Sequence, residues 1–256
     1  MNTKTISNRA LSVIDQYLNF KVGNAICSVP YFNNKTARKR GGLRVQIGKG
    51  SPQEIFDEIQ DIAVKSHISV NTFTADSLKK LLVDNNIGID CSAFVYYVLN
   101  SESEEIKKGH LDKHISFTSC HGLLGKIRCS LRPVENCDVA TFTNDKNSKV
   151  VSVKEAQPGD MITIQEENSE RDHILVIHQI QYQNFIPTEI HYSHSIAYPE
   201  DGLYGNGIRQ GMIEIVDPSK DISEQKWIES GYEDNSDQLF LRAQKSKTEI
   251  RRLRWF

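Results

Sequence analysis

The spacing of apolar and polar residues divides the chain into a helical first part and a strand-rich second part. Apolar residues recur at helical spacing in residues 8–19 and 74–84, and a capping-box start at residues 51–54 opens another such segment. The apolar run at residues 93–99 follows a turn and predicts a further helix. The N-terminal part of the chain is therefore predicted to be mainly helical.

From residue 150 onward, the pattern changes to short β-branched segments bounded by Gly, Pro, Asn and Asp, which is typical of strands. We expect strands at residues 161–164, 173–181, 189–197 and 212–216, with one or two more in residues 239–241 and 249–255. Helices followed by an antiparallel set of strands predict an α+β fold.

The domain organisation follows from the same pattern. Because no Gly/Ser-rich linker separates the two parts, we expect residues 1–256 to form a single domain. Its N-terminal helical extension covers about residues 1–87. Residues 101–150 are polar and mixed, and we interpret them as an insertion that is partly helical near residues 104–111.

Charge and composition exclude several classes of protein. The 256 residues include 31 basic and 33 acidic side chains, a net charge of −2, which argues against a nucleic-acid partner held by phosphate contacts. The chain has no apolar run of about 20 residues, so we expect no membrane insertion. It begins without the apolar core of a signal peptide, so we expect a cytoplasmic location, with release by a signal-independent route as the alternative. The basic loop at residues 35–44 is interpreted as a solvated face, or else as a contact for an anionic substrate.

The five cysteines are expected to be reduced thiols, because their number is odd and the chain shows no secretory features. The absence of a Cys-x-x-Cys pair makes a structural zinc site unexpected. Cys91 lies where a turn meets the apolar run, so free N–H groups at a helix start can stabilise its thiolate and an oxyanion. The alternative interpretation is that Cys91 is a buried core cysteine.

Four sequence pieces in order carry a family resemblance. Residues 90–95 read Asp-Cys-Ser-Ala-Phe-Val, residues 156–162 contain a Pro-Gly-Asp turn, and residues 172–177 and 192–195 each place a histidine in a predicted strand. The set resembles the NlpC-like cell-wall peptidases, a family of papain-like cysteine hydrolases. The resemblance implies N-terminal helices packed on an antiparallel sheet or half-barrel, with insertions.

The resemblance also implies the catalytic roles, with Cys91 as nucleophile, His173 as its base and His194 as the group that orients the base. Side chains alternate along a strand, so His173 and His194 meet on one face if their strands are antiparallel neighbours. His191 is the rival for the third role and lies on the opposite face from His194. No metal or cofactor is implied.

For the substrate, the resemblance implies peptides of the bacterial cell wall, often cut between γ-D-glutamate and a diamino acid. Tyr31, Asp90 and Ser92 match family positions that hold a substrate's amino end, although Tyr31 stands 60 positions before Cys91. Helix capping is the alternative role for Asp90 and Ser92, and core packing for Tyr31. A cysteine peptidase or amidase acting on muropeptides is thus predicted. The alternatives are a thiol acyltransferase or protein deamidase on the same scaffold, or a non-catalytic binding module.

Overall fold

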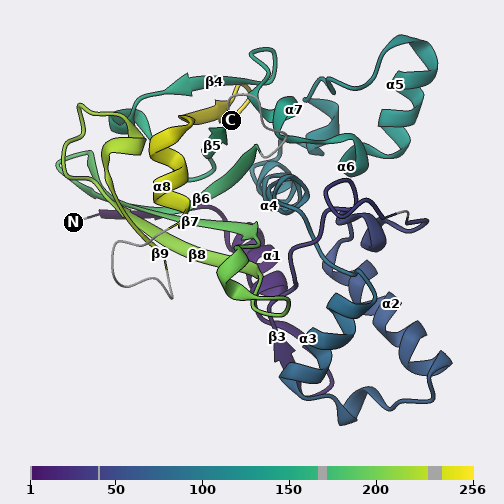
Figure 1. Cartoon of the computed structure of the whole chain (residues 1–256). Helices are drawn as coiled ribbons and strands as arrows, with labels where there is room; N and C mark the ends of the chain where they lie inside the picture. The colour runs from purple at the N-terminus through teal and green to yellow at the C-terminus, as the bar shows by residue number, and fades with distance from the viewer. Residues whose placement is uncertain (1, 40, 167–171, 230–237) are drawn as a thin grey trace.

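The computed structural model describes residues 2–39, 41–166, 172–229 and 238–256, and shows an α+β fold (Figure 1). An eight-stranded antiparallel sheet has the order β4-β10-β5-β6-β7-β8-β9, and β1 pairs with β6 beyond the end of β5. The predicted fold class is confirmed. The strands are β1 (Asn2–Thr5), β4 (Ser148–Val151), β5 (Met161–Gln165), β6 (His173–Gln183), β7 (Ile186–Ile196), β8 (Gly207–Glu214), β9 (Lys226–Glu229) and β10 (Lys247–Leu253), with a separate hairpin of β2 (Phe20–Val22) and β3 (Ala25–Cys27).

The helices begin where the sequence predicts them in the N-terminal part. Ser51 and Glu54 form the expected capping box at the start of α2, and Thr74 caps α3. The helices of the described residues are α1 (Asn8–Leu18), α2 (Pro52–Lys65), α3 (Ala75–Asp84), α4 (Cys91–Glu105), α5 (Gly122–Leu131), α6 (Pro133–Asn136), α7 (Val139–Thr143) and α8 (Gln238–Lys245). None of them, over the residues that the structure describes, is long and apolar enough to cross a membrane.

The sheet separates two hydrophobic cores. Ile174 and Val176 of β6 belong to the core that contains helices α1 to α4, whereas Leu175 and Ile177 belong to the core that contains α8. This alternation along β6 explains its nearly continuous apolar sequence, because both of its faces are covered. The central helix α4 packs against both β6 and β7 and brings its N-terminus to the sheet.

One prediction about local structure is wrong. Residues 239–241 lie in helix α8, where Leu239 and Ala243 are buried one turn apart, and a three-residue apolar run cannot distinguish a helix from a strand. The insertion is partly helical near residues 104–111, where α4 ends at Glu105 and a 3₁₀ turn starts at Leu111. Further helices follow within it, in α5, α6 and α7.

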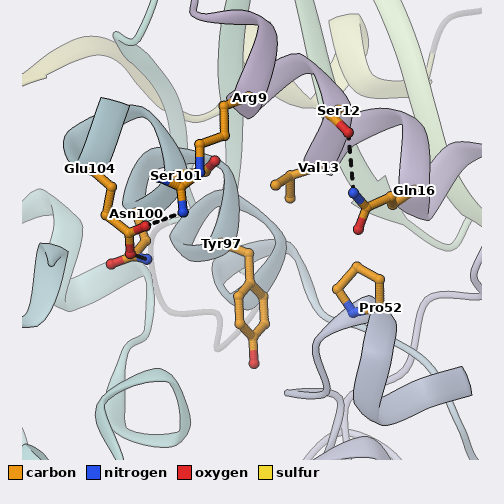
Figure 2. A pocket seen from close by; sticks show the side chains of 9 residues that line it. All are labelled: Arg9, Ser12, Val13, Gln16, Pro52, Tyr97, Asn100, Ser101 and Glu104. Atoms are coloured by element: carbon orange, nitrogen blue, oxygen red, sulfur yellow. Dashed lines mark hydrogen bonds and ion pairs between the residues drawn. The ribbon is translucent and has the colours of Figure 1, made fainter. Parts of the chain in front are cut away.

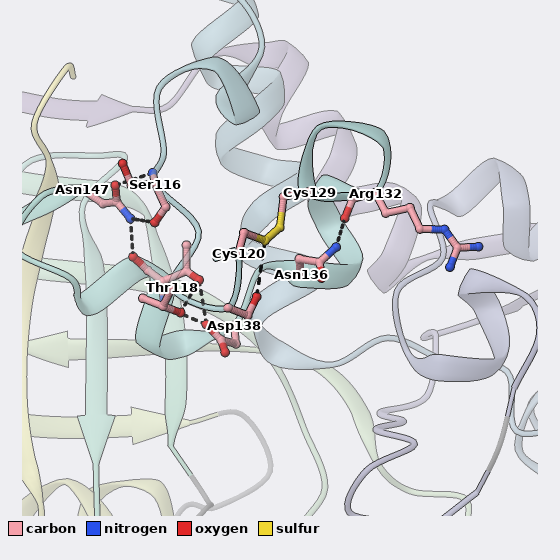
Figure 3. Close-up of a disulfide and its surroundings, with 10 residues drawn as sticks. Ser116, Thr118, Cys120, Cys129, Arg132, Asn136, Asp138 and Asn147 are labelled. Carbon is pink, nitrogen blue, oxygen red and sulfur yellow. Dashed lines mark hydrogen bonds between the residues drawn. A yellow bond between two sulfur atoms is a disulfide. The ribbon is translucent and has the colours of Figure 1, made fainter. Parts of the chain in front are cut away.

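The cysteines also differ from the prediction of reduced thiols. Cys120 and Cys129 form a disulfide with a Cα–Cα distance of 6.3 Å, which ties the start of the α5 segment to its last turn (Figure 3). Cys27, Cys91 and Cys137 are free. The pairing depends on α5 turning Cys129 back toward Cys120, and a separation of nine positions in the sequence did not indicate it.

Candidate active site

Cys91 is the first residue of α4 and lies against the first residues of β6. Asp90 caps the helix, accepting a hydrogen bond of 2.8 Å from the Ala93 N–H, so capping is one of its roles. Cys91 is 7% exposed, and its sulfur accepts a hydrogen bond from the backbone N–H of Ile174, the residue after His173. The structure thus brings the predicted nucleophile to the backbone next to the predicted base.

His173 and His194 meet across neighbouring antiparallel strands, as the alternation of side chains predicted. The register of β6 and β7, with Val176 opposite Ser193, makes the two histidines diagonal neighbours on one face. Nε2 of His173 lies 2.8 Å from Nδ1 of His194, and both rings are buried. The ring centroids are 5.1 Å apart at an interplanar angle of 70°.

Glu229 extends this pair and was not found by the sequence analysis. Nε2 of His194 lies 3.0 Å from Oε2 of the buried Glu229 on β9. A carboxylate oxygen accepts hydrogen bonds, so this ring nitrogen is the donor of the pair. Nδ1 of His194 is then an acceptor for the Nε2–H of His173. The Nδ1 of His173 keeps a lone pair, which is the state that a base requires.

Glu229 reaches His194 from two strands away because the strand between them carries a glycine there. Gly211 of β8 pairs with both Tyr192 and Glu229, and a Cβ at Gly211 would overlap the Tyr192 ring. The Tyr192 hydroxyl therefore crosses over β8 and donates to Oε2 of Glu229 at 3.3 Å. Tyr198 donates to the same oxygen at 3.3 Å, so the carboxylate is held by several donors.

The pKa values describe a neutral cysteine and histidine in the resting site. Burial raises the pKa of Cys91 to about 12, with a further increase from Asp90, while Lys49 and the Ile174 N–H oppose the shift. Burial also lowers the pKa of His173 well below its usual value, and His194 adds to this effect. Desolvation at the start of α4 therefore opposes the thiolate that the helix terminus favours.

Asp90 and Ser92 have a different partner from the one that the resemblance implied. The Lys49 ammonium lies 2.9 Å from Oδ2 of Asp90 and 2.8 Å from Oγ of Ser92, and it also donates to the Cys137 carbonyl at 2.9 Å. All of these side chains are largely buried. A cation of the chain itself thus occupies the site that was expected to hold a substrate's amino end.

Tyr31 does reach the site despite its distance along the sequence. Its backbone pairs in parallel with Ile89, two residues before Cys91. The pKa of Tyr31 is raised by burial and also by Cys91 and Asp90, which shows that the phenol lies near them. The pairing of Tyr31 with Ile89 therefore brings the tyrosine to Cys91, although the two residues are not close in sequence as the family pattern led us to expect.

Arg242 of α8 is a second residue that the sequence analysis missed. Its charge lowers the pKa values of Cys91, His173 and Tyr31, so the guanidinium lies near all three. Its Nε donates to Glu166 at 2.5 Å. Lone cations far from the motifs carry no sequence signal for a site, and Arg242 lies outside the segments that carry the resemblance.

The other candidate residues have structural partners. His191 contacts Glu189 at 3.3 Å and His178 contacts the Ser193 hydroxyl at 3.0 Å, so His191 does not take the third role. The carboxylate of Asp160, in the Pro-Gly-Asp turn, is held by the Arg252 guanidinium at 2.7 and 2.8 Å. In the basic loop, Arg40 lies outside the described residues, while Arg44 pairs with Glu54 and Glu135.

A pocket of about 400 Å³ lies away from this constellation, between α1, the start of α2 and the C-terminal half of α4 (Figure 2). Its wall includes Tyr97, whose hydroxyl donates to the Lys49 carbonyl at 2.8 Å, and Glu104, which pairs with Arg9. Cys91, His173 and His194 are not among the residues that line it. We assign it no part in the chemistry of the site.

Comparison with known proteins finds one family model that matches part of the chain. Residues 76–198 match the model of the NlpC/P60 family, and this segment contains Cys91, His173 and His194. The predicted resemblance is therefore confirmed over that segment. The family consists generally of hydrolases that act as cysteine peptidases or amidases. Neither the search of curated proteins nor that of solved structures found a match to this chain.

Proposed function

We propose that the chain, whose residues 76–198 form an NlpC/P60 family domain, hydrolyses an amide bond in cell-wall peptides with Cys91 as nucleophile. The observation that carries this proposal is the buried relay from His173 through His194 to Glu229 behind the cysteine. Three polar side chains are costly to bury together unless they pair with one another. A catalytic role accounts for their retention beside a thiol.

The tautomers set by Glu229 define the direction of proton transfer. Nδ1 of His173 takes the thiol proton as the Cys91 sulfur attacks the carbonyl carbon of the substrate. The resulting imidazolium then protonates the leaving amine, and the C–N bond breaks to leave a thioester. Water, deprotonated by His173, hydrolyses the thioester and restores the thiol. The free N–H groups at the start of α4 are suited to stabilise the oxyanion.

The contacts of Lys49 affect whether the site can bind the free amino end of a substrate. Because Lys49 already neutralises Asp90 and binds Ser92, we propose that these residues do not hold a free amino end. Tyr31 remains a candidate substrate contact. The enzyme then cuts within peptides such as a γ-D-glutamyl-diamino acid linkage, whether or not the amino end is free.

The test compares muropeptide-type substrates with a free and an acetylated amino end, using wild type and Cys91→Ala. Cleavage of both substrates by wild type alone, at similar rates, is expected. Failure to cleave either substrate would contradict the proposed substrate class. A product that carries an added amine would instead indicate the acyltransferase alternative. A strong loss of rate on acetylation would mean that the substrate's amino end displaces Lys49 from Asp90 and Ser92.

The disulfide bears on where this reaction takes place. Disulfides form and persist in oxidising compartments and are rare in the reducing cytoplasm. We therefore propose that the protein acts outside the cytoplasm, where cell-wall peptides lie, as in the alternative of signal-independent release. Alkylation of unfolded, unreduced protein should modify Cys27, Cys91 and Cys137 and leave Cys120 and Cys129 unmodified. Modification of all the cysteines would contradict this proposal.

A further inference from the structure

Helix α5 exposes an unusual concentration of large apolar side chains. Single exposed apolar residues are common on protein surfaces, whereas a contiguous group marks an interaction site. On this one short helix, the exposed fractions are 77% for Leu123, 81% for Leu124, 49% for Ile127 and 71% for Leu131. The helix lies at the edge of the molecule, away from the sheet (Figure 1).

The apolar side chains form one stripe that points away from the protein. Leu123, Ile127 and Leu131 recur every four residues, so they lie along one face of the helix, and Leu124 lies beside them. Cys129, the buried residue of α5, projects from the opposite face. Its disulfide to Cys120, drawn in Figure 3, ties this opposite face of the helix to the segment before it.

The charges around the stripe have one sign. Residues 113–134 contain no Asp or Glu, and the exposed Lys126 and Arg128 flank the stripe on its two sides. Arg132, just after the helix, pairs with Glu135 at 3.3 Å but keeps 57% of its side chain exposed. The partner of this face must therefore be apolar at its centre and anionic at its rim.

We propose that α5 docks on an anionic lipid surface, with the leucines in the headgroup–acyl boundary and Lys126 and Arg128 among the headgroups. A second copy of the same face would bring like charges together. The proposal concerns attachment to one leaflet and requires no membrane-spanning segment. It is independent of the chemistry proposed for Cys91.

Such attachment would also place the active site near the lipid surface. Residue Cys137 follows α5 and the short α6, and its carbonyl accepts hydrogen bonds from Lys49 and Ser92 beside Cys91. The chain between the docking helix and the site is thus only a few residues long. A substrate assembled at or near a membrane would then be within reach of the enzyme.

The experiment is co-sedimentation of the full chain with vesicles of phosphatidylcholine alone or mixed with phosphatidylglycerol, at low and high salt. We expect about tenfold or stronger binding to the anionic vesicles at low salt, weakened by added salt. Leu124→Glu/Leu131→Glu should abolish sedimentation with either vesicle. Lys126→Glu/Arg128→Glu should abolish the preference for anionic lipid.

The matched control is Val64→Glu, which places the same charge at a 71% exposed apolar position of α2 and should bind like wild type. Thermal unfolding of every variant shows whether it is folded. Wild-type protein that stays in the supernatant with anionic vesicles would overturn the proposal, as would unchanged binding of Leu124→Glu/Leu131→Glu. A concentration-dependent dimer abolished by the same substitutions, without lipid binding, would identify a second copy as the occupant and also overturn it.

Discussion

The His173–His194–Glu229 relay and helix α5 place their side chains under opposite conditions. In the relay, polar groups are buried and each is paired with another group of the chain. On α5, four large apolar side chains are exposed to solvent by 49% or more. Both arrangements are unfavourable by themselves, since burial penalises polar groups and water penalises apolar ones.

The comparison separates side chains that serve the proposed reaction from side chains that serve the proposed attachment to a partner. The three side chains of the relay are hydrogen-bonded to one another, so they are already aligned before any substrate binds. The exposed apolar stripe on α5, by contrast, would be buried by a binding partner. Substitutions in the relay should therefore alter catalysis or stability strongly, whereas substitutions on α5 should alter attachment and leave folding unchanged.

Removing the base should have the largest effect. For His173→Ala we expect a loss of about 10³-fold in kcat/KM on muropeptide substrates, because the substitution removes the proposed acceptor of the thiol proton. His191→Ala is the matched control, since this histidine lies on β7 but contacts Glu189 instead of the relay. Equal losses in the two variants, or full activity of His173→Ala, would contradict the assignment.

Acid should destabilise the protein through buried histidines. Burial lowers the pKa of His178 to about 4, from 6.5 in the unfolded chain. Between these values the unfolded state binds the proton and the folded state does not. This contribution to stability is therefore complete above pH 6.5 and is lost as the pH falls toward 4, by about 3 kcal/mol.

Denaturant titrations of wild type and His178→Asn across this pH range measure the effect of His178. The variant should lose less stability than wild type on acidification, because it lacks the group that takes up the proton. Parallel pH dependences in the two proteins would show that His178 does not contribute.

Weakening the outer end of the relay should have a smaller effect. For Glu229→Gln we expect a decrease of about 10- to 100-fold in kcat with little change in KM, because the amide no longer stabilises the charge on the histidines. The acid limb of the pH–rate profile should also shift. Glu189→Gln is the control, and a stability loss with an unchanged pH profile would indicate a purely structural role for Glu229.

The smallest expected effect is that of a substitution in the exposed stripe on α5. Leu124→Glu should change the free energy of unfolding by less than about 0.5 kcal/mol, as expected for an exposed site. Leu82→Ala, which truncates a fully buried leucine of α3, should cost about 2 to 5 kcal/mol. Destabilisation by Leu124→Glu on the scale of Leu82→Ala would mean that the stripe packs within the chain.

The sequence alone predicted the features that depend on neighbouring residues. Helix starts such as Ser51–Glu54, the strand pattern of β6 and β7, and the order of the Cys91, His173 and His194 motifs are all encoded within short segments. Alternation along a strand was sufficient to place the two histidines on one face. The family match over residues 76–198 confirms the resemblance drawn from those segments.

Only the tertiary structure decided which distant groups complete these motifs. Glu229 reaches His194 across Gly211, Lys49 fills the Asp90–Ser92 site, and Cys120 pairs with Cys129. No local pattern marks these partners, because their proximity comes from sheet order and chain crossing. The direction of the Cys91 pKa shift likewise comes from burial, since desolvation depends on everything packed around the sulfur and not only on its position at a helix start.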